Sequence, residues 1–184
     1  MDKSEVYLRR TVRRFIIETI NSNKMKILYI HGLGSTPEKE DTKSLKGAKI
    51  ISPSFNYKSK TILFNSMCEI IEKEQIKAVI GHSFGGYFAY YLSEKYGIPS
   101  LLFAPSFDSE DRELQPQPKN IKSKNKDCIK IAILGLDDDV IIEKEKQIRE
   151  LNKDNYNIFK EKIGHDIPKR IKVSYFEEFI NLIK

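Results

Sequence analysis

A serine stands between glycines in the segment GHSFGG, residues 81–86. Apolar residues before it predict a buried strand, and the residues after it predict a helix to about Tyr96. A serine on so sharp a strand-to-helix turn, a nucleophile elbow, needs neighbours without bulky side chains two residues away on either side. Gly81 and Gly85 meet this need. Ser83 is therefore a candidate nucleophile, although the motif also arises by chance and gains weight only with partners elsewhere in the chain.

The first partner that Ser83 needs is a base, because a serine hydroxyl is a weak nucleophile until a positioned histidine accepts its proton. The chain has three histidines. His82 adjoins the serine, and its side chain is expected to point away from it. His31 precedes the serine, against the order serine, acid, histidine that this type of elbow follows. His165 follows the last predicted strand, at the edge of the sheet where sites form, and we predict that it is the base.

The second partner is a carboxylate that orients the histidine, expected just beyond the preceding strand. Asp137, Asp138 and Asp139 are adjacent there. Acids in such a place also cap the next helix or bind a cation, but three adjacent side chains alternate in direction and do not easily converge on one metal ion. We assign the orienting role to Asp138 and expect no metal site. Asp137 and Asp139 remain alternatives for that role, and otherwise are expected to be exposed or to cap the next helix.

Two backbone N–H groups are candidates for an oxyanion hole. One belongs to Phe84, at the predicted start of the helix. The other belongs to Leu33 in the segment HGLGSTP, residues 31–37, where glycines allow close approach to a substrate oxygen; an ordinary glycine turn is the alternative. We expect a shallow acyl pocket, with His31 and Phe107 as substrate-binding candidates.

The segments that must position these residues alternate between strand and helix patterns. Apolar runs predict strands at 27–30, 49–54, 78–82, 100–104, 129–134 and 156–159. Amphipathic patterns predict helices at 61–74, from the elbow to 96, at 141–151 and at 173–183. Such alternation indicates an α/β fold with a doubly wound, mostly parallel sheet and helices on both faces. Residues 105–127 contain few large apolar side chains, so we expect a loop there and no cap domain.

The N-terminal segment has a different character. Residues 4–20 predict an extra amphipathic helix with arginines mostly on one side. We therefore divide the chain into a basic extension, residues 1–24, and a catalytic domain, residues 25–184. The helix either packs on the domain, associates with a second copy to form a homo-oligomer, or binds an acidic partner. No nucleic-acid partner is expected, because no recognised binding motif accompanies the arginines.

Composition limits the classes of protein to which the chain can belong. The chain has 184 residues, 40% of them hydrophobic and 32% charged, which fits one soluble domain. It lacks an apolar run long enough for a membrane helix and an N-terminal signal pattern, so we expect a cytoplasmic protein without a membrane partner. Cys68 and Cys128 have no metal-binding spacing. The net charge of +6 is spread over lysine-rich, acid-containing stretches and indicates solvated faces.

Four motifs in order carry a resemblance to a known family. They are ILYIHGLGSTP, GHSFGGYFAYYLSEKYGIPSLLFAPSF, GLDDDVI and GHDIPKR. Over residues 25–184 the chain resembles the α/β-hydrolase superfamily, and within it the short, lidless bacterial esterases of the YqiA type. The resemblance places the family's nucleophile on Ser83, its acid on Asp138 and its histidine on His165. It implies hydrolysis of carboxylic esters without a cofactor.

We therefore expect a serine esterase that acts on small, short-acyl esters through an acyl-enzyme on Ser83. Thioester hydrolysis or acyl transfer would use the same residues, because the sequence does not show which nucleophile ends the cycle. A non-catalytic binding protein on the same fold is the alternative from a different class.

Overall fold

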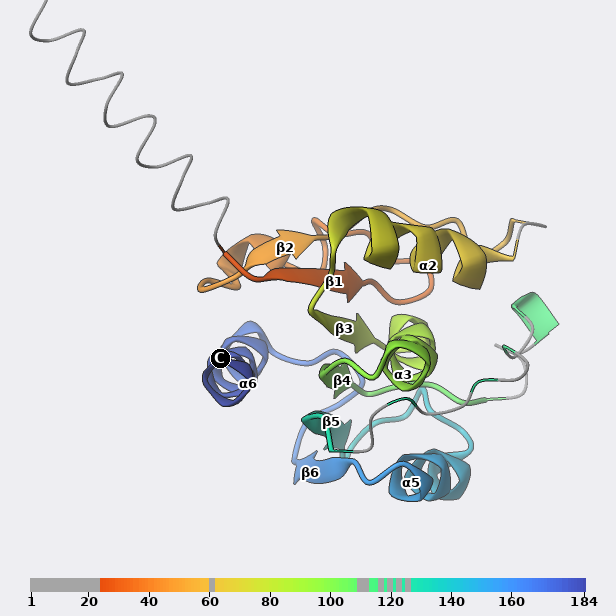
Figure 1. Cartoon of the computed structure of the whole chain (residues 1–184). Coiled ribbons are helices and arrows are strands. Elements are labelled where there is room, and N and C mark those ends of the chain that lie inside the picture. Colours follow the sequence, from red (N-terminus) through yellow and green to blue (C-terminus); the bar gives the residue numbers. More distant parts are fainter. Residues whose placement is uncertain are drawn as a thin grey trace, which may run out of the picture.

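A computed structural model describes residues 24–59, 62–108, 113–115, 118, 121, 124 and 127–184. The helix predicted at residues 4–20 lies outside the described residues, as does much of the loop predicted at 105–127. In the described part, six strands form one parallel sheet in the order β2-β1-β3-β4-β5-β6 (Figure 1). The strands are β1 (Lys26–Ile30), β2 (Lys49–Ile51), β3 (Ala78–His82), β4 (Ser100–Phe103), β5 (Lys130–Gly135) and β6 (Asn157–Glu161).

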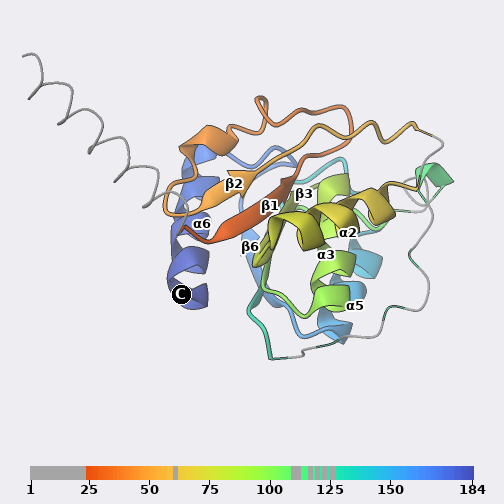
Figure 2. The same cartoon turned by 45° about the horizontal axis from the view of Figure 1, so that its top comes forward.

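Helices cover both faces of this sheet (Figures 1 and 2). One face carries α2 (Leu63–Glu74), α3 (Phe84–Tyr96) and α5 (Lys144–Lys153), and the other carries α6 (Lys169–Ile183). A short 3-10 helix, η1 (Thr42–Ser44), follows β1. The predicted doubly wound α/β class is confirmed, and no cap domain folds over the sheet in the part of the chain that is described. None of the described helices is long and apolar enough to cross a membrane.

Strand β1 shows how the sequence divides the core into two layers. Leu28 and Ile30 point into the apolar layer beneath α2 and α3, whereas Ile27 and Tyr29 point into the layer beneath α6. Side chains alternate between the two faces of a strand, so a strand buried on both faces must be apolar throughout. A fully buried side chain of this size contributes about 1.5–3 kcal/mol. Burial therefore fixes the register of β1 and the position of the loop that follows it.

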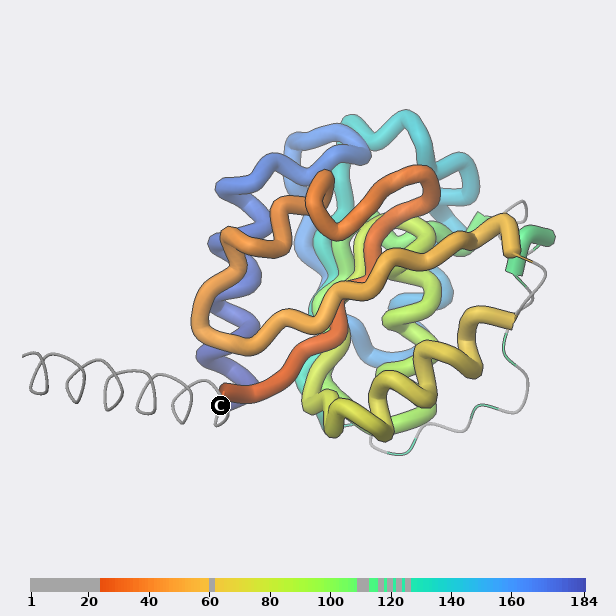
Figure 3. Tube along the Cα trace, turned by 90° about the horizontal axis from the view of Figure 1, so that it is seen from above, coloured from red at the N-terminus to blue at the C-terminus, as the bar shows by residue number. Residues whose placement is uncertain are grey.

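The strand order brings the candidate residues to one edge. Strand β1 lies between β2 and β3, so the direction of the strand order reverses there, and ligands bind beyond the carboxyl ends of strands at such a point. Ile30 is paired with Gly81 at the ends of β1 and β3. In Figure 3 the loops after β1 and β5, and the segment that leads into α6, lie along this same edge.

Three element boundaries differ from the predicted ones by three residues or more. Strand β2 ends at Ile51 rather than at residue 54. Helix α5 begins at Lys144 rather than at 141, because carboxylates of Asp138 and Asp108 accept the N–H groups of residues 140–143 and hold them in a turn. Helix α6 begins at Lys169, earlier than predicted, directly after Pro168, whose ring fixes φ and which has no N–H to leave unpaired.

Two glycines allow β1, β3 and α3 to approach closely. A Cβ atom on Gly81 would collide with the backbone of Gly85 and Gly86. A Cβ atom on Gly85 would collide with the carbonyl groups of Ile30 and His31. Only glycine fits at both positions, so the elbow can form only where these backbones touch.

Replacing Gly85 by alanine is expected to lower the free energy of unfolding by about 3 kcal/mol or more, because backbone atoms of β1 must move to admit the methyl group. Urea unfolding followed by circular dichroism measures the loss. Gly164→Ala is the control, since its Cβ would come no closer than 3.9 Å to the carbonyl oxygen of Asp137. A Gly85→Ala protein as stable as the control would contradict the close contact.

Candidate active site

Ser83 occupies a strained turn between β3 and α3. Its backbone has φ 53° and ψ −124°, a conformation that residues with a side chain rarely adopt. The Ser83 N–H donates to the carbonyl oxygen of Phe103 at 2.9 Å, and the Ser83 carbonyl accepts from the N–H groups of Gly86 and Ser106 at 2.8 and 3.1 Å. Strain of this kind persists only where surrounding contacts hold it, and it gathers at functional sites.

The side chains of Ser83, His165 and Asp138, called the triad below, form a continuous chain of hydrogen bonds. His165 Nε2 lies 2.9 Å from Ser83 Oγ, and His165 Nδ1 lies 3.0 Å from Asp138 Oδ2. A ring protonated at Nδ1 donates to the carboxylate and leaves Nε2 free to accept the serine proton. The structure thus brings together the three residues predicted from the sequence, which follow three different strands.

The carboxylate of Asp138 is kept ionised by its surroundings. Burial alone would raise the pKa of this carboxyl, but hydrogen bonds from His165 and from the Ile141 and Val140 N–H groups bring it below the ordinary value for aspartate. The side chain is only 4% exposed. A buried, ionised carboxylate at this distance can orient the imidazole and stabilise it when it becomes positively charged.

Backbone contacts hold the acid loop and the histidine loop together. The N–H of Leu136 donates to the Glu161 carbonyl at 2.8 Å, and the N–H of Asp137 donates to the Ile163 carbonyl at 3.1 Å. These two bonds extend the β5–β6 pairing beyond the strand ends. Asp138 therefore faces His165, whereas the side chains of its neighbours Asp137 and Asp139 are exposed.

The loop after β1 lies against the serine. A Cβ atom on Gly32 would be 3.2 Å from Ser83 Cβ. Among the described residues, the N–H groups of Leu33 and Phe84 donate to no acceptor. The side chain of Leu33 is 42% exposed. One of these amides thus belongs to the loop that lies against Ser83, and the other to the first residue of α3.

The expected substrate contacts of His31 and Phe107 need correction. His31 is buried; its Nδ1–H donates to the Gly32 carbonyl at 2.9 Å, and its Nε2 accepts the Phe55 N–H at 2.9 Å. Phe107 is fully buried, with its ring centre 5.1 Å from that of Tyr90. Both side chains belong to the interior and present no open surface to a ligand.

A polar hollow of about 400 Å³ opens beside the triad. Its lining includes the residues next to Ser83 and His165 in the chain. The lining residues are Leu33, Gly34, Ser35, Lys39, Glu40, His82, Asp166, Ile167 and Lys172.

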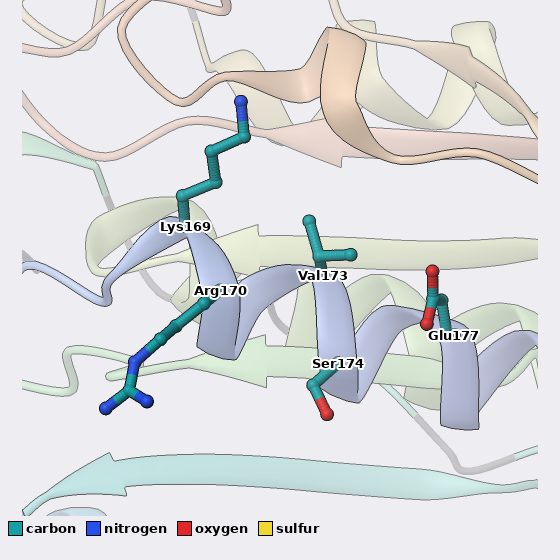
Figure 4. Close-up of a pocket in the computed structure, with 5 residues that line it drawn as sticks. All are labelled: Lys169, Arg170, Val173, Ser174 and Glu177. Carbon is teal, nitrogen blue, oxygen red and sulfur yellow. The ribbon is translucent and has the colours of Figure 1, made fainter.

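Other hollows lie away from the triad. One of about 690 Å³ is lined by α6 alone (Figure 4). Another, of about 600 Å³, is lined by residues just before β1, β2, β3 and β4 and by residues at the end of α6. Within the described ranges, no group of three or more histidine, cysteine, aspartate or glutamate side chains is arranged to hold a metal ion.

Two charged residues, Glu40 and Lys172, lie next to the triad and were not predicted from the sequence. Glu40 contacts His82, and Lys172 contacts Glu40. The sequence does contain a signal for Lys172, which lies on the same apolar stripe of α6 as Phe176 and Phe179. A lysine on a buried stripe requires a charged or polar partner. Glu40 had no such signal, since it lies in a polar loop rich in charged residues.

Solved structures with the same fold include several proteins of the α/β-hydrolase superfamily. A Xanthomonas campestris protein assigned to that superfamily has a TM-score of 0.63 and 16% identity, over 88% of this chain and 98% of its own. The fluorophosphonate-binding serine hydrolase F of Staphylococcus aureus has a TM-score of 0.60 and 12% identity, over 87% and 83% of the two chains. A Bacillus cereus carboxylesterase has a TM-score of 0.55 and 15% identity, over 88% and 89%. No protein in the curated set matches this chain.

These solved structures are too distant in sequence to assign the chain to a family, but a family model does so. The model, described as "Uncharacterised protein family (UPF0227)", matches residues 26–184 and so spans every strand of the sheet and all three residues of the triad. The chain therefore belongs to the UPF0227 family, with the fold of the α/β-hydrolase superfamily.

Proposed function

We propose that this protein is a serine hydrolase that cleaves carboxylic esters of small, short-acyl substrates through an acyl-enzyme on Ser83. The observation that carries the proposal is the hydrogen-bonded chain from Asp138 through His165 to Ser83, on a strained elbow at the carboxyl edge of the sheet. Similar folds occur in a carboxylesterase and in a serine hydrolase that binds fluorophosphonates, which supports the same class of chemistry.

The proposed reaction follows from the geometry. His165 Nε2 accepts the Ser83 proton as Oγ attacks the ester carbonyl, and Asp138 stabilises the imidazolium that forms. The N–H groups of Phe84 and Leu33 hold the oxyanion, and His165 returns its proton to the leaving alcohol. Water, deprotonated by the same histidine, then attacks the acyl-enzyme; the bond between the acyl carbon and Ser83 Oγ breaks, the acid leaves, and His165 returns the proton to Oγ. These steps require no cofactor.

Thioester hydrolysis and acyl transfer to an acceptor other than water are the alternatives that use the same triad. The triad activates Ser83 and does not itself select the leaving group or the final nucleophile. A binding protein that uses this fold without catalysis would not need an activated serine.

Replacing Ser83 by alanine is expected to lower kcat for p-nitrophenyl acetate by about 10⁴- to 10⁶-fold, because no nucleophile remains. His165→Ala should be nearly as severe. The rate of p-nitrophenol release measures the loss of turnover in each variant. Labelling by a fluorophosphonate probe measures independently whether the serine is activated.

Ser174→Ala is the matched control, since this serine is exposed on α6 and lies outside the triad (Figure 4). It should label and turn over like the wild type. A wild-type protein without labelling or turnover dependent on Ser83 would overturn the enzyme proposal in favour of the binding protein.

Replacing Asp138 by asparagine is expected to lower kcat by about 10⁴-fold near neutral pH, because the amide cannot stabilise the imidazolium and can select the wrong tautomer. Asp137→Asn and Asp139→Asn should change kcat by less than about threefold, since both side chains are exposed. The same kinetic assay compares the three variants. A larger loss at either neighbour would reassign the orienting acid.

Substrate size is expected to matter because the hollow beside the triad is mainly polar and the rings of Phe84 and Phe107 are buried. An added methylene gains about 0.8 kcal/mol only when it leaves water. We therefore expect kcat/KM to be higher for acetyl than for hexanoyl p-nitrophenyl esters. Specificity constants that rise through dodecanoate would show that an apolar channel binds the acyl chain.

A further inference from the structure

A buried group of charged side chains lies directly behind the triad. It consists of Glu40, from the loop after β1, His82, at the end of β3, and Lys172, from α6, and we call it the Glu40 cluster. All three residues are at most 9% exposed. Burying charges costs free energy unless they are paired and hydrogen-bonded, and apolar residues of similar size are often no less stable. Such a cluster next to a candidate nucleophile therefore calls for a reason beyond stability.

Glu40 receives donors from four directions. Its carboxylate lies 2.9 and 3.0 Å from His82 Nδ1, 2.5 Å from Lys172 Nζ, 3.1 Å from the Tyr29 hydroxyl and 3.4 Å from the Gly32 N–H. Burial alone would raise the pKa of this carboxyl, but the hydrogen bond and charge of His82, followed by those of Lys172, hold it well below its usual range. Glu40 is thus ionised, and it is tied to the glycine that lies against Ser83.

His82 joins this carboxylate to the histidine loop. Its Nδ1 faces Glu40, and its Nε2 lies 3.1 Å from the backbone carbonyl oxygen of His165. Both partners are acceptors, so the ring makes both hydrogen bonds only when it carries a proton on each nitrogen. The two histidine rings are 5.4 Å apart between centres. Since His82 is also bonded covalently to Ser83, it links the nucleophile to the main chain of the base.

We propose that the Glu40 cluster is a positioning device for the triad, in which a doubly protonated His82 holds the main chain of His165 while Glu40 holds the loop that bears the Leu33 N–H. This inference rests on the proposed function. None of the three residues is assigned contact with the reacting atoms. Their effect is on geometry, and a displacement of about 1 Å at a reacting group costs about 100-fold in rate.

The test compares His82→Gln with the wild type on p-nitrophenyl acetate. We expect kcat per folded molecule to fall about 100-fold with little change in KM. Lys172→Arg keeps the charge and the donor, so it should retain most of the activity that Lys172→Met loses. Ring ¹⁵N shifts of the wild type at pH 7 should show both His82 nitrogens protonated.

A matched control is the buried pair of Glu94 and Lys130, 2.6 Å apart and remote from the triad. Glu94→Gln should lower the free energy of unfolding without changing kcat. If His82→Gln does not fold, the kinetics of Lys172→Met and the ¹⁵N shifts of the His82 ring in the wild type test the proposal instead. A neutral His82 ring, or a folded His82→Gln protein with wild-type kinetics, would overturn the positioning role alone. A wild type without Ser83-dependent turnover would overturn the proposed function as well.

Discussion

The contact on which the site depends is the close approach of α3 to β1. It exists because Gly85 has no side chain to keep the helix away from the carbonyl groups of Ile30 and His31. The contact allows α3 to start immediately after Ser83, and it holds the serine at a positive φ that the chain would not otherwise adopt. It also places Gly32 beside Ser83. One packing constraint therefore determines where both the nucleophile and the neighbouring loop lie.

The parallel sheet positions the other two residues of the triad, Asp138 and His165. All six strands are parallel and end at the same edge, so the loops after β3, β5 and β6 meet there. Backbone hydrogen bonds continue from β5 and β6 into the acid and histidine loops. Asp138 and His165 are thus positioned by main-chain contacts as well as by the hydrogen bond between them. Electrostatic groups fixed in this way need little reorganisation during a reaction.

What the sequence revealed depends on how local each signal is. The strands, the helices and the elbow were predictable because hydrophobic periodicity and glycine spacing act over a few residues. The grouping of Ser83, Asp138 and His165 was predictable because each follows a predicted parallel strand, and the carboxyl ends of such strands meet at one edge of the sheet. Burial of His31 and Phe107 was not predictable, since it depends on rings packed from other segments. The Glu40 cluster was missed because its members lie on three distant elements, and no local pattern indicates which charges will pair.

Around Ser83, the groups that are buried differ from those that remain on the surface. The ring of Phe84, next to the serine in the chain, and that of Phe107, predicted to contact substrate, lie entirely in the core beneath α3. The interior behind the serine is charged, whereas the large apolar side chains left around the site, Leu33, Leu136 and Val140, are more than 40% exposed. Exposed side chains bury little apolar area on binding and so contribute little affinity. The hollow lined by Ser35, Lys39 and Asp166 offers mainly polar contacts, and this supports the proposed preference for short acyl chains.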